Sequence, residues 1–351
     1  MSNKELRIPS LDGIRAIAAS LVFVSHAGLD DVIPGGFGVT IFFFLSGYLI
    51  TTLLRVEYER SGEISFKRFY LRRVYRIFPP MYIVLATLIL LGCAGVVKSD
   101  VTLAALVAQV ANLTNYYVIL HGSEHLVPLT IPFWSLAIEE HFYLLFPLAL
   151  VLLLRRVEYR RAAAIFALLC AVVLLWRCYL VLHVGVSQHR TYMATDTRLD
   201  SLLFGCIMGI WSNPSLDRDS LAFSPRKWVL LLCLSVVLLL GTFLFRSPAF
   251  RETFRYSLQG VALFPIFFCS VRFSSWPIFA WLELKLVRGL GVISYTFYLC
   301  HFACLRLAEQ YIDGSAITRG LAAFALAIAF ASASYFFVER HLGTIRRRLH
   351  G

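Results

Sequence analysis

The stretch LDGIRAIAASLVFVSHAG (11–28) is apolar enough to enter a lipid bilayer, yet it carries Arg15 and His26. At about 1.5 Å of rise and about 100° of rotation per residue, the eleven-residue separation spans roughly 16 Å and three turns plus about 20°. The two side chains therefore project from nearly the same helix face at opposite depths. Ionisable groups inside a membrane span are costly and are functional candidates by default. The simpler alternative is that Arg15 extends to the inner membrane surface and His26 lies at the outer one.

The whole chain has the same apolar character. Of its 351 residues, 59% are hydrophobic and 15% are charged, whereas soluble domains average about 25% charged residues. The composition indicates an all-α, multi-pass membrane protein with no removable signal peptide. The eight cysteines form no CxxC pair, so we expect no metal site. We expect one transmembrane domain over 1–351, with a helical bundle at 11–338 and a basic cytoplasmic tail at 339–351. We expect ten spans, most of them near the ~20 residues a crossing needs, at roughly 11–28, 36–54, 77–97, 136–154, 162–184, 198–212, 227–245, 254–271, 287–308 and 316–338.

Loop charge predicts the orientation of these spans. Basic residues gather in 55–76, 155–161 and 345–350, which the positive-inside rule assigns to the cytoplasm. This pattern explains the net charge of +12 without a nucleic-acid partner. An eleventh apolar run, at 101–120, would put 155–161 on the wrong side if it crossed, so we predict a single interfacial or re-entrant helix there. Both termini are then cytoplasmic. Two arginines, Arg246 and Arg251, fall in a predicted outer loop against the rule.

Two polar features lie in and after the second span. The run GFGVTIFFFLSGYLITTLL (36–54) places Ser46 and Gly47 in an aromatic-rich helix, where small residues permit close helix packing, the simpler explanation of this pair. The basic segment ends in LRRVYRIFPP (71–80), in which Arg73 and Arg76 are three residues apart. On one helix face, two guanidiniums can hold phosphate groups bidentately. The alternative is an ordinary positive flank of a membrane span.

Further ionisable residues enter later spans. WSLAIEEHFYLLFP (134–147) carries adjacent glutamates that cannot share one helix face. We expect Glu139 to pair with His26, which would orient the imidazole and raise its basicity, and Glu140 to have a lesser role. The motifs TRLDSLLFG (197–205) and SYTFYLCHF (294–302) each allow a structural ion pair or a satisfied core histidine as the alternative. The candidates for substrate binding or for structure are Ser46, Tyr48, Trp134, Glu140, Arg198, Asp200 and His301.

In order and spacing, these motifs resemble those of the acyltransferase family 3 integral membrane proteins. The resemblance runs from IPSLDGIRAIA (8–18) to FFVER (336–340), where His341 follows at a place where the family often has proline. Members of this family O-acetylate bacterial surface glycans and some secreted small molecules. Some also carry a soluble SGNH-type esterase domain, and we expect this chain to act without one. The resemblance implies acetyl-CoA, or a related acyl-CoA, as the donor, a hydroxyl as the acceptor, and the bacterial inner membrane as the location.

A mechanism follows from this resemblance. Arg73, Arg76 and Arg15 would bind the donor from the cytoplasm, and a pantetheine arm of roughly 15–20 Å matches the rise from Arg15 to His26. We expect His26 to act as general base, Glu139 to orient it, and Arg15 to stabilise charge on the donor side. A covalent acyl-enzyme on His26, Ser25 or Ser46 is the alternative.

The acceptor stays open at this point. A polysaccharide repeat unit, a lipopolysaccharide sugar, a lipo-oligosaccharide or a macrolide-like metabolite would each present a hydroxyl, and the predicted outer loops 98–135 and 185–197 would select among them. A glycan or lipid transporter or flippase is the competing function, because many spans with buried charge also suit a translocation path. The sequence has no clear internal repeat of the transporter kind. A non-catalytic membrane scaffold fits poorly with so many ionisable groups inside the spans.

Overall fold

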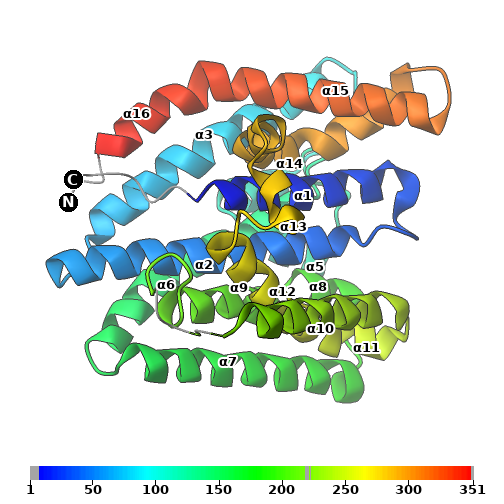
Figure 1. Cartoon of the computed structure of the whole chain (residues 1–351). Helices are drawn as coiled ribbons and strands as arrows, with labels where there is room; N and C mark the ends of the chain where they lie inside the picture. The colour runs from blue at the N-terminus through cyan, green and yellow to red at the C-terminus, as the bar shows by residue number, and fades with distance from the viewer. Residues whose placement is uncertain (1–7, 218–220, 222, 349–351) are drawn as a thin grey trace.

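The chain folds into a bundle of long helices that run roughly side by side (Figure 1). The computed structural model describes residues 8–217, 221 and 223–348, and these form no β-strand. In chain order the helices, with η for short π or 3₁₀ turns, are α1 (Pro9–Val24), η1 (Ser25–Leu29), α2 (Gly35–Ser61), α3 (Phe66–Cys93), α4 (Leu103–Val110), α5 (Thr114–His121), α6 (Phe133–Leu154), α7 (Tyr159–Tyr179), η2 (Leu180–Val184), α8 (Gln188–Met193), α9 (Thr195–Ile210), α10 (Pro225–Leu244), α11 (Pro248–Glu252), α12 (Phe254–Arg272), α13 (Pro277–Ala280), η3 (Trp281–Glu283), α14 (Lys285–Tyr311), α15 (Ala316–Ser334), η4 (Tyr335–Glu339) and α16 (Arg340–Arg348).

Eight helices within the described residues are long and apolar enough to cross a membrane, which confirms a multi-pass integral membrane bundle. They match eight of the ten predicted spans, and the other two correspond to α1 and α9. Each of these has 16 residues, or about 24 Å of helix against a hydrocarbon core of about 30 Å, although α1 continues into the five-residue turn η1. Both are packed inside the bundle, where protein rather than lipid surrounds them. The count of ten crossings and the side of the termini stay predictions.

The segment predicted as one interfacial or re-entrant helix at 101–120 forms two helices instead, α4 and α5, of 8 residues each. The break falls at Asn112, whose φ of 57° is left-handed, a conformation that asparagine tolerates better than most residues. A helix of this length rises about 12 Å and is too short to cross the membrane. The segment therefore does not cross the membrane as a single helix, which agrees with the prediction. The prediction of one continuous helix is wrong, because the segment forms two.

Helices α2 and α9 approach each other more closely than larger residues would allow. A Cβ atom on Gly47 would lie 1.9 Å from the carbonyl oxygen of Leu202, and one on Gly205 would lie 2.0 Å from that of Phe44. Small residues permit such backbone contact between membrane helices. The contact fixes the depth at which each helix presents its polar side chains.

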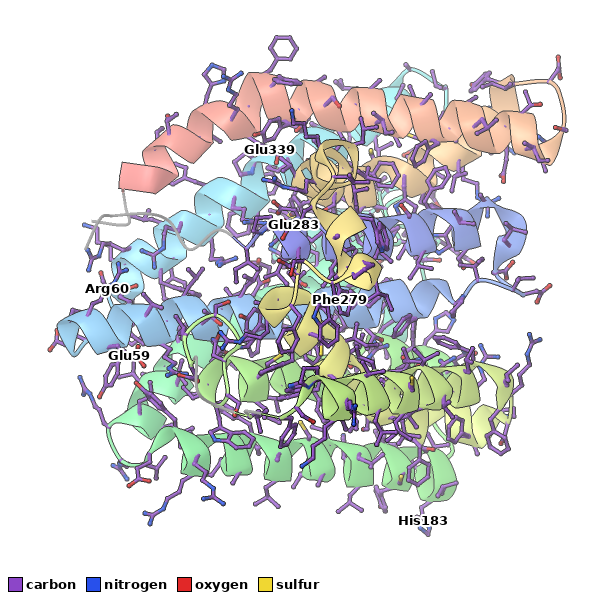
Figure 2. The ribbon with its side chains drawn as sticks, in the orientation of Figure 1. Glu59, Arg60, His183, Phe279, Glu283 and Glu339 are labelled. Atoms are coloured by element: carbon purple, nitrogen blue, oxygen red, sulfur yellow. The ribbon has the colours of Figure 1, made fainter. Side chains whose placement is uncertain are left out.

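Labelled residues and helix connections identify the two ends of the bundle. Glu59 and Arg60 lie at one end, and His183 lies at the other (Figure 2). The connection between α2 and α3 is at the first end, which we name the basic end, together with α16 (Figure 1). The connections from α1 to α2, from α10 to α11 and from α14 to α15 are at the opposite end, named the far end. The predicted basic tail is helical from Glu339 to Arg348, and its residues 349–351 lie outside the described residues.

Candidate active site

Three arginines line a small cavity of about 90 Å³ inside the bundle. We name it the arginine cavity. Arg15 comes from α1, and Arg73 and Arg76 come from α3. Helix α3 begins after Ser65, whose hydroxyl accepts a hydrogen bond from the Arg68 backbone N–H at 3.5 Å. From this start, both arginines of the RxxR motif face the cavity, as their spacing predicts. The other polar residues in the lining are Ser46, Ser135, Glu139, Tyr143, Ser294, Tyr295 and Tyr298.

The neighbouring arginines of the basic end are paired with carboxylates and do not line this cavity. Arg72 lies 3.0 Å from Glu57, and Arg55 lies 2.6 Å from Asp217. The guanidinium of Arg76, in contrast, makes no hydrogen bond or ion pair with any residue that the structure describes. The arginine cavity therefore holds positive charge that the protein itself does not fully neutralise.

Glu139 belongs to the arginine cavity, and its predicted pairing with His26 is wrong. Its Oε1 accepts a hydrogen bond from the Ser46 hydroxyl at 2.7 Å, and its Oε2 accepts one from the Tyr143 hydroxyl at 3.0 Å. Glutamate and histidine lie in different cavities because α6 presents Glu139 at the level of Arg15, toward the basic end. Glu140 is not part of the cavity lining, and its buried Oε1 finds no hydrogen-bond partner among the described residues.

A second cavity, of about 660 Å³, lies toward the far end and contains His26. We name it the histidine cavity. Helix α1 ends at Val24, and His26 lies in the short turn η1 that follows, two residues before Gly28, whose φ of 98° is left-handed. The imidazole lines this cavity. Other residues of its lining are Ser25, Asp30, Asp31, Trp134, Gln188, Tyr192, Arg246, Arg251, Arg255, Tyr256, Gln259, Tyr298 and Phe302.

The partner of His26 is His301, not a carboxylate. His26 Nδ1 and His301 Nε2 are 2.8 Å apart, and the planes of the two rings are nearly parallel, with an interplanar angle of 11°. His301 Nδ1 lies 2.5 Å from the carbonyl oxygen of Tyr298. Because a carbonyl oxygen only accepts, a neutral His301 carries its proton on Nδ1 and accepts at Nε2. His26 then donates from Nδ1 and keeps the lone pair on its Nε2 free.

The two cavities adjoin each other. Val39 and Tyr298 line both of them. The Tyr298 hydroxyl is held by the Ser135 hydroxyl at 2.7 Å. Arg15 and His26 thus lie in successive cavities along the bundle, which agrees with their predicted placement at different depths. A molecule that entered past the arginines would meet, across this shared wall, one that occupied the histidine cavity.

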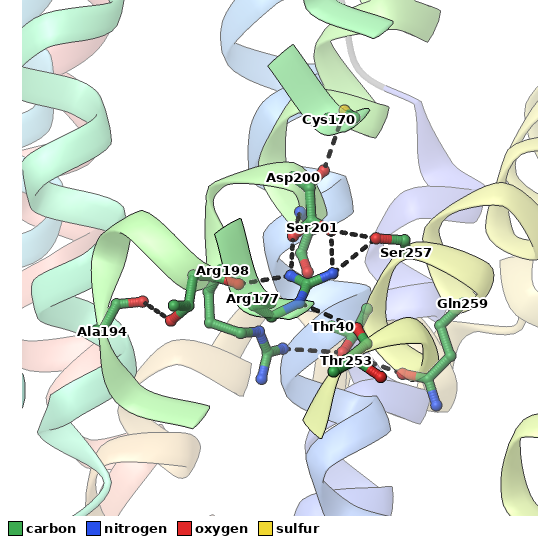
Figure 3. Close-up of polar contacts among 11 residues, drawn as sticks. Thr40, Cys170, Arg177, Ala194, Arg198, Asp200, Ser201, Thr253, Ser257 and Gln259 are labelled. Carbon is green, nitrogen blue, oxygen red and sulfur yellow. Dashed lines mark hydrogen bonds and ion pairs between the residues drawn. The ribbon is translucent and has the colours of Figure 1, made fainter. Parts of the chain in front are cut away.

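The predicted residue Asp200 takes part in a structural network instead of lining a cavity. It forms a fully buried ion pair with Arg177 at 2.8 Å, and Ser257 and the carbonyl oxygen of Thr253 accept further hydrogen bonds from the same guanidinium (Figure 3). Arg177 is absent from the predicted residues. A lone arginine in the apolar run 162–184 was the signal that could have found it, since charge inside a span demands a partner.

Of the remaining predicted residues, only Trp134 lines the histidine cavity, where its ring packs against that of Tyr192 at a tilt of 46°, with the ring centroids 4.7 Å apart. Arg198 is fully buried and donates to Thr40 at 3.0 Å (Figure 3). The hydroxyl of Tyr48 bonds to Asn213 and to Ser215 at the basic end. Arg198 and Tyr48 lie outside the lining of both cavities.

Comparison with known proteins gives a consistent assignment. The acyltransferase family 3 model, described as an acyltransferase domain, matches residues 8–336. A protein of Staphylococcus aureus strain COL, named "Putative O-acetyltransferase", is 31% identical over 355 residues, which cover 96% of this chain and 57% of that protein. Peptidoglycan O-acetyltransferase OatA of Listeria monocytogenes is 27% identical over 350 residues, covering 95% of this chain and 55% of OatA.

A third relative, O-acetyltransferase OatA of Staphylococcus aureus strain NCTC 8325, is 28% identical over 347 residues, covering 95% of this chain and 56% of the relative. The chain therefore spans little more than half the length of these curated relatives. No solved structure matches it. Because the family model covers nearly all of its residues, this chain belongs to acyltransferase family 3, a family of integral membrane proteins.

Proposed function

We propose that this chain transfers an acetyl or short acyl group from an acyl-CoA donor to a hydroxyl of a cell-surface glycan, in the bacterial inner membrane. The observation that carries the proposal is the pair of adjoining cavities, one lined by three arginines and the other containing His26. A donor that enters from the cytoplasm and an acceptor that enters from the other side each need a binding cavity. The two cavities must adjoin so that the reacting groups can meet. The relatives named O-acetyltransferases support the same reaction.

The arginine cavity suits the donor. Coenzyme A carries several phosphate charges, and guanidiniums bind phosphate through paired, charge-assisted hydrogen bonds. Arg76 is the strongest candidate, because its guanidinium makes no hydrogen bond or ion pair within the described chain. Arg73 lies over the Tyr143 ring at 5.1 Å, and Arg15 makes a long contact of 3.4 Å with Asp12. In this arrangement the thioester reaches the wall formed by Val39 and Tyr298.

His26 suits the general base. Its Nε2 takes the proton of the acceptor hydroxyl as the hydroxyl oxygen attacks the thioester carbonyl. The C–S bond then breaks, the acyl ester forms, and the proton on His26 passes to the departing thiolate. His301 holds the tautomer that this step requires, since its Nε2 accepts from His26 Nδ1. Glu139 has a role on the donor side in this scheme, and no role in orienting His26.

A covalent route stays open, and the contacts narrow it to one serine. The Ser46 hydroxyl donates to Glu139 at 2.7 Å inside the arginine cavity, whereas Ser25 lines the histidine cavity. Glu139 could take the Ser46 proton as the serine oxygen attacks the donor and the thiolate leaves. Rapid-quench mass spectrometry with donor and no acceptor distinguishes the routes: an acyl group on Ser46 supports the covalent one, and an unmodified chain supports direct transfer.

A glycan is the acceptor class that the observations favour. The histidine cavity, at about 660 Å³, falls in the usual range of about 300–1,000 Å³ for ligand sites. Trp134 and Tyr192 supply aromatic faces along its wall. Peptidoglycan is the first acceptor to test, because a relative bears that substrate in its name. Neither the macrolide-like acceptor nor the lipopolysaccharide sugar receives comparable support.

The test is a transfer assay with the purified protein in lipid nanodiscs, given acetyl-CoA and peptidoglycan fragments. We expect acetylated glycan and free CoA in equal amounts. His26→Ala should lower kcat by about 10²–10⁴-fold, the usual contribution of a positioned base. Arg76→Gln should raise KM for acetyl-CoA, with little effect on KM for the glycan. Lys67→Gln, an equal charge change at an exposed site on the same helix, is the control and should match the wild type.

Two results would overturn the proposal. One is near-normal product from a folded His26→Ala protein. The other is movement of glycan or lipid across the bilayer with acetyl-CoA left intact, which would favour the transporter instead.

A further inference from the structure

The lining of the histidine cavity includes three arginines at the far end of the bundle. Arg246 precedes α11, Arg251 lies within it, and Arg255 lies in the first turn of α12. Arg246 and Arg251 break the positive-inside pattern that the other loops follow. The positive-inside rule explains arginines on the cytoplasmic side of a membrane protein but not on the outer side. Another explanation is therefore needed for the arginines around this cavity.

Among the described residues, only one of the three guanidiniums has a carboxylate within ion-pair distance, and that contact is long. Arg251 makes no hydrogen bond or ion pair in the described part of the chain. Arg246 donates to the backbone carbonyl of Asp31 at 3.0 Å, not to its carboxylate. Arg255 lies 3.9 Å from Glu252 and donates to the Tyr256 hydroxyl at 2.9 Å, but its buried Nε has no hydrogen-bond partner. Positive charge that close carboxylates only partly neutralise therefore lines this cavity.

A fourth arginine, buried behind the lining of the histidine cavity, adds to the positive potential inside it. Arg198 is fully buried, and its guanidinium carbon lies 4.0 Å from the ring centroid of Tyr256, which lines the cavity. The nearby carboxylate of Asp200 is engaged by Arg177. The Arg198 charge thus acts through apolar surroundings, where electrostatic fields are screened less than in water.

Two acidic residues at the rim do not cancel this charge. Asp30 and Asp31 also line the cavity, but both are exposed. Neither forms an ion pair with the three arginines among the described residues. Water screens these exposed carboxylates more strongly than it screens the partly buried guanidinium of Arg255.

We infer that the histidine cavity binds an anionic acceptor, whose phosphate or carboxylate group is held by Arg246, Arg251 and Arg255 while a hydroxyl of the same molecule faces His26. This inference rests on the proposed function and narrows its substrate class from glycans in general to glycans that carry negative charge. A phosphate would come from a phosphate-linked saccharide, and a carboxylate from an acidic sugar. Both use the same paired hydrogen bonds to guanidinium.

The test compares three matched acceptors by their binding to the full chain in nanodiscs without donor. They are the neutral tetramer of N-acetylglucosamine, the same tetramer with a 1-phosphate, and the same tetramer oxidised to a terminal carboxylate. We expect an anionic tetramer to bind the wild type at least about tenfold more tightly than the neutral one, since one charge-assisted hydrogen bond is worth about that factor. A preference for phosphate indicates a phosphate-linked saccharide, and a preference for carboxylate indicates an acidic sugar.

Variants locate the effect. Arg251→Gln and Arg255→Gln should each reduce binding of the anionic tetramer by about tenfold and leave the neutral one unchanged. Removing the Arg251 guanidinium breaks no hydrogen bond or ion pair among the described residues, so this variant should fold normally. Arg319→Gln is the matched control, because Arg319 lies near the start of α15 at the same end and outside both linings. It should keep the wild-type preference.

Equal binding of the neutral and anionic tetramers by the wild type would overturn the inference, and so would a preference that survives in the Arg251→Gln/Arg255→Gln double variant. The transfer assay separates this failure from that of the proposed function. If neutral and anionic tetramers are acetylated with equal kcat/KM, the anionic-acceptor inference is wrong and the proposed transfer reaction is supported. If an anionic tetramer binds tightly through the arginines but acetyl-CoA is not consumed, the proposed transfer reaction is wrong and the anion site is supported.

Discussion

At the scale of single residues, the reactive candidate is a histidine held by a second histidine. A carboxylate partner would add negative charge and raise the basicity of His26. His301 adds no such charge, and the Tyr298 carbonyl behind it only fixes the proton position. The pair therefore orients His26 without trapping its proton, which suits a base that must return the proton to a leaving thiolate.

This reading makes His301 a positioning residue with a measurable signature. His301→Ala should lower kcat on the order of 10²-fold while KM for acetyl-CoA stays constant, because the His26 ring loses the acceptor that fixes its tautomer. His301→Gln keeps a side-chain carbonyl that can accept from His26 Nδ1, so most of the activity should return. Steady-state kinetics on the two purified variants measures this difference. Equal losses in both variants, or a rise in KM alone, would argue against the positioning role.

The sequence predicted most of the site residues but not how they are grouped. Helical spacing gave the relative depth of Arg15 and His26 and the common face of Arg73 and Arg76. It could not tell that the face of α6 carrying Glu139 meets Ser46 of α2, so the predicted pairing of Glu139 with His26 is wrong. Which side chains meet across two helices depends on how the helices pack, and the local sequence does not specify that pairing.

At the scale of elements, the contact of α2 with α9 positions the donor-side residues. Ser46 lies next to Gly47, whose missing side chain lets the α9 backbone approach. The small residues of the second predicted span (36–54) indicate close helix packing, and the contact between Gly47 and the α9 backbone agrees with that prediction. The break between α4 and α5 was less predictable, because Asn112 in an otherwise helical run only permits a left-handed turn and does not require one.

Gly205→Ala should disrupt this contact strongly. The added Cβ would lie 2.0 Å from the Phe44 carbonyl oxygen, so the two helices must separate, and overpacking of this kind costs about 1–3 kcal/mol. Thermal unfolding in detergent, followed by the loss of monodisperse protein, measures the effect. Gly241→Ala on α10 is the control, because its Cβ would meet no atom within 4 Å. If both variants unfold at the same temperature as the wild type, the close approach of α2 and α9 is wrong.

At the scale of the whole molecule, composition and hydropathy predicted the membrane bundle, and eight of the predicted spans reappear as helices long enough to cross. The exceptions, α1 with the turn η1 that follows it and α9, contribute Arg15, His26, Arg198 and Asp200. No residue of α1 or α9 is exposed, so protein surrounds the charged side chains of these two helices. Hydropathy identifies helices whose side chains suit a lipid environment. It is therefore least able to predict the helices at the centre of the bundle, which protein surrounds and where the site lies.

The proposed direction of transfer depends on the orientation of the whole bundle, with the basic end in the cytoplasm. Single cysteines test it in a variant from which the exposed Cys93 and Cys233 have been removed. Glu63→Cys lies at the basic end between α2 and α3, and Asp313→Cys lies at the far end between α14 and α15; both sites are exposed. In intact bacterial spheroplasts, a membrane-impermeant maleimide should label Asp313→Cys and should reach Glu63→Cys only after permeabilisation. The reverse pattern would place the arginine cavity on the side away from cytoplasmic CoA, and the donor assignment would then fail even if the cavities are correct.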